Sequence, residues 1–210
     1  MSSTNRSDKR RAADNYPTPG WVTRAILPKL NLGAHRVLEP ACGEGAIIRE
    51  LIAIGVHSQR IIGVDIRDDA LDEVSLEFPS CNFKLEDFLE SRCNTFDTLQ
   101  LLCDGVRPGL VITNPPYSLA REFVERSLEL VVSGGEVAML LRLNFLGSQK
   151  RAAWFRSNTP NVYVLSRRPS FTNGGTDSCE YAWMIWRQGR SGAGSIEVLD
   201  VQPYQKEKPP

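Results

Sequence analysis

Short apolar runs alternate along the chain with segments whose apolar residues recur every three or four positions. The runs predict seven buried strands, and the segments between them predict helices, most clearly over Leu119 to Val132. The expected strands are 36–39, 60–65, 82–85, 109–112, 135–143, 161–166 and 180–186. This order of elements indicates an α/β fold built around a mostly parallel sheet.

Length and composition indicate one globular domain. The chain has 210 residues, of which 41% are apolar and 24% are charged, as in ordinary soluble domains. It has no apolar run of the roughly 20 residues that span a bilayer, and its polar N-terminus does not resemble a signal peptide. Its five cysteines are scattered without a CxxC pair, which argues against a disulfide framework or zinc site and favours a reducing, cytoplasmic location.

We expect three segments along the chain. Residues 1–14 are polar and basic and predict a flexible arm. Residues 15–190 contain all the expected strands and are interpreted as the functional domain. Residues 191–210 begin with Ser-Gly-Ala-Gly-Ser and are interpreted as a linker and a C-terminal tail.

The net charge is zero, but the charges are unevenly distributed. Residues 37–104 contain 14 acids and 5 bases, whereas residues 141–190 contain 8 bases and 2 acids. One half could therefore hold a cationic small ligand while the other faces phosphates. Chance variation in surface charge is the alternative.

Asn114-Pro115-Pro116-Tyr117 follows an expected strand and so lies on a turn at its carboxyl end, where open α/β sheets bind ligands. Neither proline has an N–H, so the turn presents carbonyl oxygens without donors. Asn114 adds an amide oxygen, and Tyr117 adds a flat ring. A planar group with an NH₂, such as a base with its exocyclic amine, could donate two N–H hydrogen bonds to these oxygens while it stacks on the ring. Alternatively, asparagine and proline serve the turn geometry alone.

A second turn, Pro40 to Ala46, joins the first expected strand to a helix, in the layout of a nucleotide-binding loop. Its spacing is neither G-x-G-x-x-G nor a Walker A motif. Glu39 and Glu44 would repel a pyrophosphate but suit a ligand with hydroxyls, an amino group or a positive charge. Gly43 and Gly45 let the backbone approach that ligand closely.

The next expected strand ends in an acid, Asp65, and another acid, Asp87, follows the strand after it. Asp65 comes about 20 residues after the glycine turn, where such folds place an acid that accepts hydrogen bonds from ribose hydroxyls. Asp87 could accept from an adenine amine while Phe88 packs on the ring. Asp87 could equally cap the next short helix.

Three stretches together resemble class I S-adenosylmethionine-dependent methyltransferases. Residues 37–45, VLEPACGEG, resemble their cofactor loop, and residues 114–117, NPPY, resemble the catalytic motif of enzymes that methylate adenine N6. Residues 15–19, NYPTP, resemble the N-terminal cofactor motif of the same DNA methyltransferases. With the loop containing Arg168-Pro169-Ser170-Phe171, the chain is most similar to small phage-type DNA N6-adenine methylases over roughly residues 15–187.

The resemblance implies a Rossmann-like fold with a seven-stranded, mostly parallel sheet, an antiparallel last strand and helices on both faces. It implies S-adenosyl-L-methionine as the cofactor, DNA as the partner, and neither a metal nor a membrane. The expected cofactor contacts are Tyr16, Thr18, Glu39, Pro40, Ala41, Gly43, Gly45, Asp65, Ile66, Asp87, Phe88 and Asn114. The expected catalytic turn is Asn114, Pro115, Pro116 and Tyr117, acting on a flipped adenine. The expected substrate contacts are Tyr117, Arg142, Arg168 and Phe171.

Other substrates for the same chemistry stay open. An RNA adenine presents the same amine, and related NPPY enzymes methylate a glutamine side chain of a protein. The latter usually carry an N-terminal helical domain, for which the residues before the first strand leave no room. A subunit that binds cofactor without catalysis is a further alternative. Because we see no large target-recognition insertion, specificity would be low, lie in residues 144–175, or come from a homodimer or partner subunit.

Overall fold

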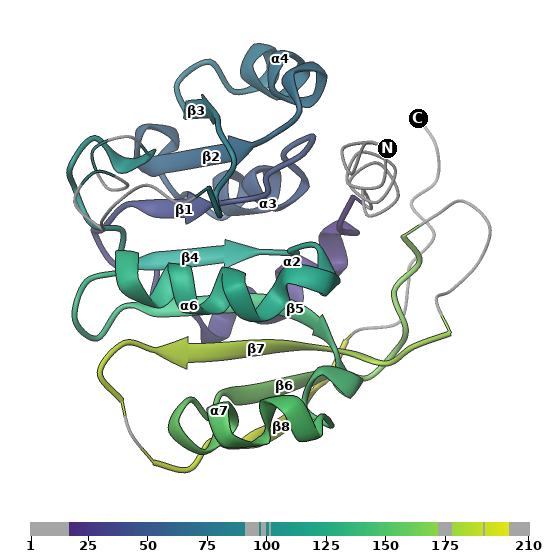
Figure 1. Ribbon diagram of the computed structural model, residues 1–210. Coiled ribbons are helices and arrows are strands. Elements are labelled where there is room, and N and C mark those ends of the chain that lie inside the picture. The colour runs from purple at the N-terminus through teal and green to yellow at the C-terminus, as the bar shows by residue number, and fades with distance from the viewer. Residues whose placement is uncertain are drawn as a thin grey trace, which may run out of the picture.

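The computed structural model describes residues 17–90, 97, 100, 102–171, 178–190 and 192–201. Within these residues, the strands form one sheet in the order β3-β2-β1-β4-β5-β7-β6-β8 (Figure 1). Their bounds are β1 (Val37–Glu39), β2 (Ile61–Asp65), β3 (Asn82–Leu85), β4 (Leu110–Thr113), β5 (Glu136–Arg142), β6 (Asn161–Leu165), β7 (Tyr181–Arg187) and β8 (Ile196–Leu199). β7 runs antiparallel to its neighbours β5 and β6, and the other pairs are parallel. The expected mostly parallel α/β sheet is confirmed.

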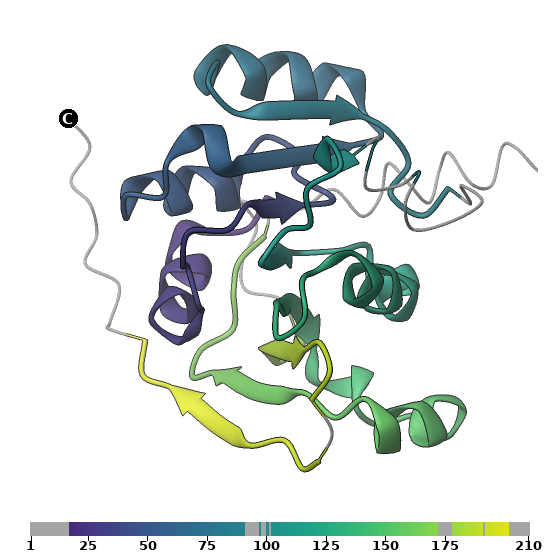
Figure 2. The ribbon, with the colours of Figure 1, turned by 90° about the vertical axis from the view of Figure 1, so that its left-hand side faces the viewer.

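Helices cover both faces of this sheet, as expected. The α-helices are α2 (Gly20–Ile26), α3 (Ala46–Ala53), α4 (Asp68–Glu77), α6 (Ala120–Leu130) and α7 (Ala152–Ser157). Short 3₁₀ helices are η1 (Leu27–Lys29), η2 (Ser58–Arg60), η3 (Tyr117–Leu119), η4 (Leu143–Phe145) and η5 (Gln149–Arg151). Figure 2 shows α2 and α6 on opposite faces of the sheet.

Each face of the sheet has its own hydrophobic core. In β4, Leu110 and Ile112 pack with α2 and α3, whereas Val111 packs with α6. Successive side chains of a strand point to opposite faces, so a strand covered on both sides is apolar throughout. This explains why the central strands were recognisable as continuous apolar runs.

The structure differs from the sequence analysis at the end of the chain. Residues 191–210 were interpreted as a linker and tail, but β8 pairs in parallel with β6, from Val162↔Ile196 to Leu165↔Leu199. β8 is an edge strand, and its Ile196 and Val198 are 76% and 63% exposed. The described sheet therefore has eight strands rather than seven, and its antiparallel strand is the second last.

The parallel strands β1, β2 and β4 end at one edge of the sheet, and α2 brings the N-terminal segment to that edge. The buried indole Nε1 of Trp183, in the middle of β7, donates a hydrogen bond of 2.8 Å to the backbone oxygen of Val22. This bond fixes α2 on the sheet. Residues 17–19, directly before α2, are thereby held near the carboxyl ends of the strands.

Candidate active site

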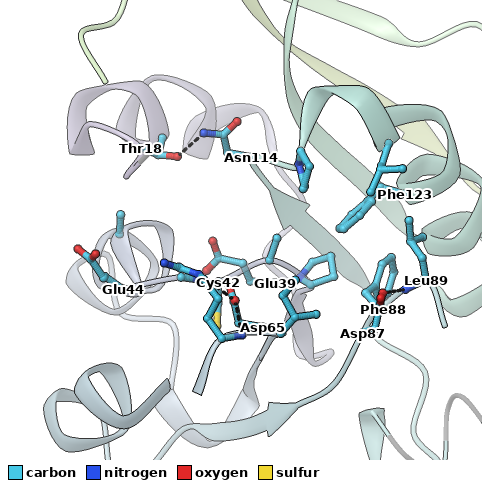
Figure 3. Close-up of a pocket in the computed structure, with 18 of the residues that line it drawn as sticks. Thr18, Glu39, Cys42, Glu44, Asp65, Asp87, Phe88, Leu89, Asn114 and Phe123 are labelled. Carbon is cyan, nitrogen blue, oxygen red and sulfur yellow. Dashed lines mark hydrogen bonds and ion pairs between the residues drawn. The ribbon is translucent and has the colours of Figure 1, made fainter. Parts of the chain in front are cut away.

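A cavity of about 480 Å³ lies at the carboxyl ends of β1, β2 and β4 (Figure 3). Most of the residues predicted to contact a cofactor line it: Thr18, Glu39, Pro40, Ala41, Gly43, Asp65, Ile66, Asp87, Phe88 and Asn114. Thr18 and Asn114 lie across the cavity from Glu39 and Asp65, while Phe88 and Phe123 close one side (Figure 3). Tyr16, the remaining N-terminal candidate, lies outside the described residues.

The carboxylate of Asp65 joins the end of β2 to the glycine turn. Its Oδ2 accepts a 2.7 Å hydrogen bond from the backbone N–H of Gly43. Its Oδ1 accepts from the backbone N–H of Arg67 at 3.0 Å and from Arg67 Nε at 3.3 Å. Three donors therefore fix the carboxylate at the cavity wall. Arg67, for which the sequence pattern predicts no role, lines the same wall.

The two glycines of the turn have different surroundings. Gly43 lines the cavity with φ of 50°. Gly45 has φ of 74° and faces away from the cavity, because a Cβ built on it would lie 2.4 Å from Cγ2 of Val74 in α4. The lining residues do not include Gly45. Gly45 is therefore required for close packing of the turn against α4, while its contact with a ligand stays a prediction.

Glu39 is the most strongly perturbed acid at the cavity. Its side chain is 2% exposed, and no described group forms a hydrogen bond with its Oε2. Burial, and secondarily the negative charge of Asp65, raise the pKa of Glu39 well above its ordinary value. A buried acceptor without a partner is costly. A donor or cation in the cavity would satisfy it, which suits a ligand with an ammonium or sulfonium group.

A hydrogen bond joins the N-terminal segment to the Asn-Pro-Pro-Tyr turn. Asn114 Nδ2 donates to Oγ1 of the buried Thr18 at 3.2 Å. The amide oxygen of Asn114 consequently points away from Thr18 (Figure 3). Two segments separated by 96 positions thus meet at the cavity. Pro116 also lines it, whereas Pro115 is buried and does not belong to the lining.

Tyr117 points to a second group of side chains, beside the cavity. Its ring centroid lies 5.8 Å from that of Tyr181, and the guanidinium carbon of Arg142 lies 4.9 Å from the Tyr117 centroid. Phe171 joins the same group, with its ring 5.1 Å from that of Tyr181. Phe171 also packs against the hydrophobic core. The structure therefore brings three of the four predicted substrate residues together.

Arg168 does not belong to this group. Its guanidinium forms an exposed ion pair with Glu180. Several other bases of residues 141–190 also have local partners: Arg187 pairs with Glu136, and Arg151 donates to the backbone oxygen of Phe145. The predicted excess of positive charge is thus partly neutralised, while Lys150 and Arg156 are exposed at η5 and α7.

Neighbouring residues hold the side chains that we expect to contact the adenine of the cofactor. Phe88 is buried against Phe123, with ring centroids 5.0 Å apart. Asp87 Oδ1 accepts from the backbone N–H of Leu89 at 3.0 Å, so it stabilises a turn rather than the start of a helix. Phe123 was assigned only to the core face of α6, because helical spacing does not separate core from cavity positions.

Neither a metal nor a membrane site is found in the described part of the chain. No group of three or more His, Cys, Asp or Glu side chains there could hold a metal ion. No helix in these segments is long and apolar enough to cross a bilayer.

No protein-family model and no curated protein matches this chain, but solved structures do. A predicted O-methyltransferase from Agrobacterium tumefaciens aligns with a TM-score of 0.63 and 15% identity over 88% of each chain. A protein assigned as an RNA methyltransferase from Pyrococcus horikoshii aligns with a TM-score of 0.62 and 15% identity, over 83% of this chain and 85% of that one.

A modification subunit assigned to a type I restriction enzyme from Vibrio vulnificus aligns with a TM-score of 0.58 and 18% identity. The alignment covers 92% of this chain but 48% of that subunit, so the chain spans about half of its length. These likenesses, with the strand order and the antiparallel β7, establish the architecture. The chain has the Rossmann-like fold of the class I S-adenosylmethionine-dependent methyltransferases.

Proposed function

We propose that this protein transfers a methyl group from S-adenosyl-L-methionine to the N6 amine of adenine in DNA. The observation that carries the proposal is the hydrogen bond between Asn114 and Thr18. It holds the Asn-Pro-Pro-Tyr turn at an acid-lined cavity, with the amide oxygen of Asn114 turned away from Thr18. The fold supports methyl transfer in general, and this turn supports an amine as the acceptor.

The residues of the cavity fit the proposed cofactor. S-adenosyl-L-methionine supplies an electrophilic methyl group on a positively charged sulfur when it is bound. The buried, unpartnered Oε2 of Glu39 suits the cationic end of such a ligand. Asp65 would accept from the ribose hydroxyls with lone pairs that Gly43 and Arg67 leave free, and Ile66 and Phe88 would flank the adenine, with Asp87 near its amine.

The turn supplies acceptors for the target amine. An aromatic exocyclic amine is a poor nucleophile because its lone pair is delocalised into the ring. The amide oxygen of Asn114 would accept a hydrogen bond from one of its N–H groups, and the backbone carbonyl of Pro115, a buried residue behind the cavity lining, would accept one from the other; together they would favour a pyramidal nitrogen. Because these groups are held in place before the substrate binds, positioning and polar preorganisation would provide the rate.

The cofactor loop at 37–45, the Asn-Pro-Pro-Tyr turn and the motif at 15–19 together resemble DNA methyltransferases, and this combination favours DNA as the substrate. A base reaches such a site only after leaving its stack, and Tyr117 and Phe171 would contact it there. One neighbour in fold is a modification subunit of a restriction enzyme and another is a structure in complex with DNA. Since two of the expected basic side chains, Arg168 and Arg187, form ion pairs within the chain, we propose that a second copy or a partner subunit contributes to sequence recognition.

Tritiated methyl transfer to unmethylated duplex DNA, single-stranded DNA and RNA in parallel, followed by nucleoside analysis, tests the proposal. Label in N6-methyladenine from DNA is the expected result. Label found in RNA alone would show that the substrate is adenine in RNA and not in DNA. No label on any nucleic acid, with cofactor bound, would refute a nucleic-acid substrate and direct the search to a protein glutamine.

A further inference from the structure

Arg142, the last residue of β5, lies opposite Tyr181 across the antiparallel β5–β7 pair. Its Nε donates a 3.0 Å hydrogen bond to the hydroxyl of Tyr181. Its guanidinium carbon lies 4.9 Å from the ring centroid of Tyr117 and 5.9 Å from that of Tyr181. One planar cation therefore connects the tyrosine of the Asn-Pro-Pro-Tyr turn to the first residue of β7.

Tyr181 is a fixed support for this arrangement. Its side chain is 1% exposed, so the surrounding core holds the ring in place. The Tyr117 ring contacts the Tyr181 ring at an interplanar angle of 52°. The Phe171 ring contacts the same Tyr181 ring at an interplanar angle of 63°. Both rings proposed to contact the substrate are thus held by the same buried tyrosine.

The geometry of Arg142 differs from that of a side chain prepared for a phosphate. A phosphate-binding arginine presents its donors to solvent in a planar fork. Here Nε is bonded to a buried hydroxyl, and the guanidinium lies over an aromatic face, where the ring quadrupole attracts it. A lysine could keep the charge but not the Nε donor of the planar group.

We infer that Arg142 is a positioning residue: it sets the plane of the Tyr117 ring on which the target base stacks, rather than binding a phosphate. The inference rests on the proposed function and adds a role for Arg142 within that site. Small errors in the orientation of a bound group lower turnover strongly. Loss of Arg142 should therefore slow methyl transfer while leaving the cofactor cavity, to which Arg142 does not belong, unchanged.

The test compares wild type, Arg142→Met, Arg142→Lys, Tyr181→Phe and the double variant of Arg142→Met with Tyr181→Phe, with Arg156→Met as the control. Arg156 is exposed on α7 and lies outside the contacts between Arg142, Tyr117 and Tyr181, so its substitution shows the effect of losing one positive charge alone. Each variant is measured for its single-turnover methylation rate on DNA, its calorimetric affinity for S-adenosylhomocysteine, its thermal unfolding and the salt dependence of DNA binding.

We expect Arg142→Met to lower the single-turnover rate about tenfold or more, with cofactor affinity and the salt dependence unchanged. Arg142→Lys should be intermediate. Tyr181→Phe should lower the rate as well, because it removes the acceptor that orients Arg142. The double variant should have the same single-turnover rate as Arg142→Met alone, because both substitutions break the same contact between Arg142 and Tyr181.

A phosphate contact would give a different result: the slope of log affinity against log salt concentration would fall by about one unit for Arg142→Met. That result, or additive effects of the two substitutions, would overturn the positioning role. Should Arg142→Met not fold, Tyr181→Phe still tests the inference, because an unchanged rate would refute it. An inactive wild type would instead refute the proposed function and this inference with it, so the two failures are distinguishable.

Discussion

Replacing Gly45 with alanine should destabilise the protein rather than weaken cofactor binding directly. Gly45 has φ of 74°, in the left-handed region, and the new Cβ would lie 2.4 Å from Val74 Cγ2. A residue with a Cβ in this conformation costs about 1–2 kcal/mol. Val74 is buried in α4, so relief of the overlap would cost roughly another 1–3 kcal/mol, as in other overpacked cores. The expected loss is therefore about 2–5 kcal/mol, or roughly 4–20 °C in Tm for a domain of this size.

Gly134→Ala provides a matched control. Gly134 has φ of 76°, but nothing lies within 4 Å of a Cβ placed there. Its substitution should cost only the conformational part, about 1–2 kcal/mol. Urea unfolding of the two variants and wild type would measure the difference. Equal losses would refute the contact with Val74, and a Gly45→Ala variant with wild-type stability but weak cofactor binding would return Gly45 to the ligand contacts.

Three further substitutions test the cavity. Glu39 has a raised pKa, so the folded apoprotein binds a proton that the unfolded chain has already lost, and its stability falls as pH rises above the ordinary carboxyl pKa. Glu39→Gln should remove this dependence, so its Tm should gain on that of wild type as the pH is raised above the ordinary carboxyl pKa; parallel Tm curves would contradict the shift. Asp65→Ala should weaken calorimetric cofactor affinity at least about tenfold, because the ribose hydroxyls would lose the acceptor proposed for them; unchanged affinity would remove Asp65 from the site. Thr18→Val should lower turnover about tenfold by releasing the Asn114 amide, and a variant that turns over at the wild-type rate would show that the hydrogen bond is dispensable.

The central sheet was predictable because its strands are covered on both faces. The three apolar core residues that open β4 follow one another, Leu110-Val111-Ile112, and no surface position interrupts them. β8 could not be recognised in the same way. Ile196-Glu197-Val198 does alternate β-branched and polar residues, as strands do, but the segment is short and follows a Ser-Gly-Ala-Gly-Ser stretch that indicates a linker. Only Leu199 of this strand is buried in the core, so its place in the sheet depends mainly on backbone pairing with β6.

The composition of the cavity was also predictable, but its internal contacts were not. Glu39 and Asp65 end their strands and Asn114 directly follows one, and parallel strands bring their carboxyl ends together. The contact of Thr18 with Asn114 depends on where α2 packs, which local sequence does not encode. The contact of Arg142 with Tyr181 was not predictable either, because it depends on the register in which β5 pairs with β7.

Asn114→Ala gives the most direct test of amine methylation at the Asn-Pro-Pro-Tyr turn. Formation of N6-methyladenine on DNA would be measured at saturating cofactor, beside calorimetric cofactor binding by the same variant. Loss of a preorganised acceptor predicts a fall in turnover of at least about a hundredfold with cofactor affinity nearly intact. Turnover within a few-fold of wild type would contradict the proposed role of the turn and, with it, the assignment of adenine N6 as the methyl acceptor.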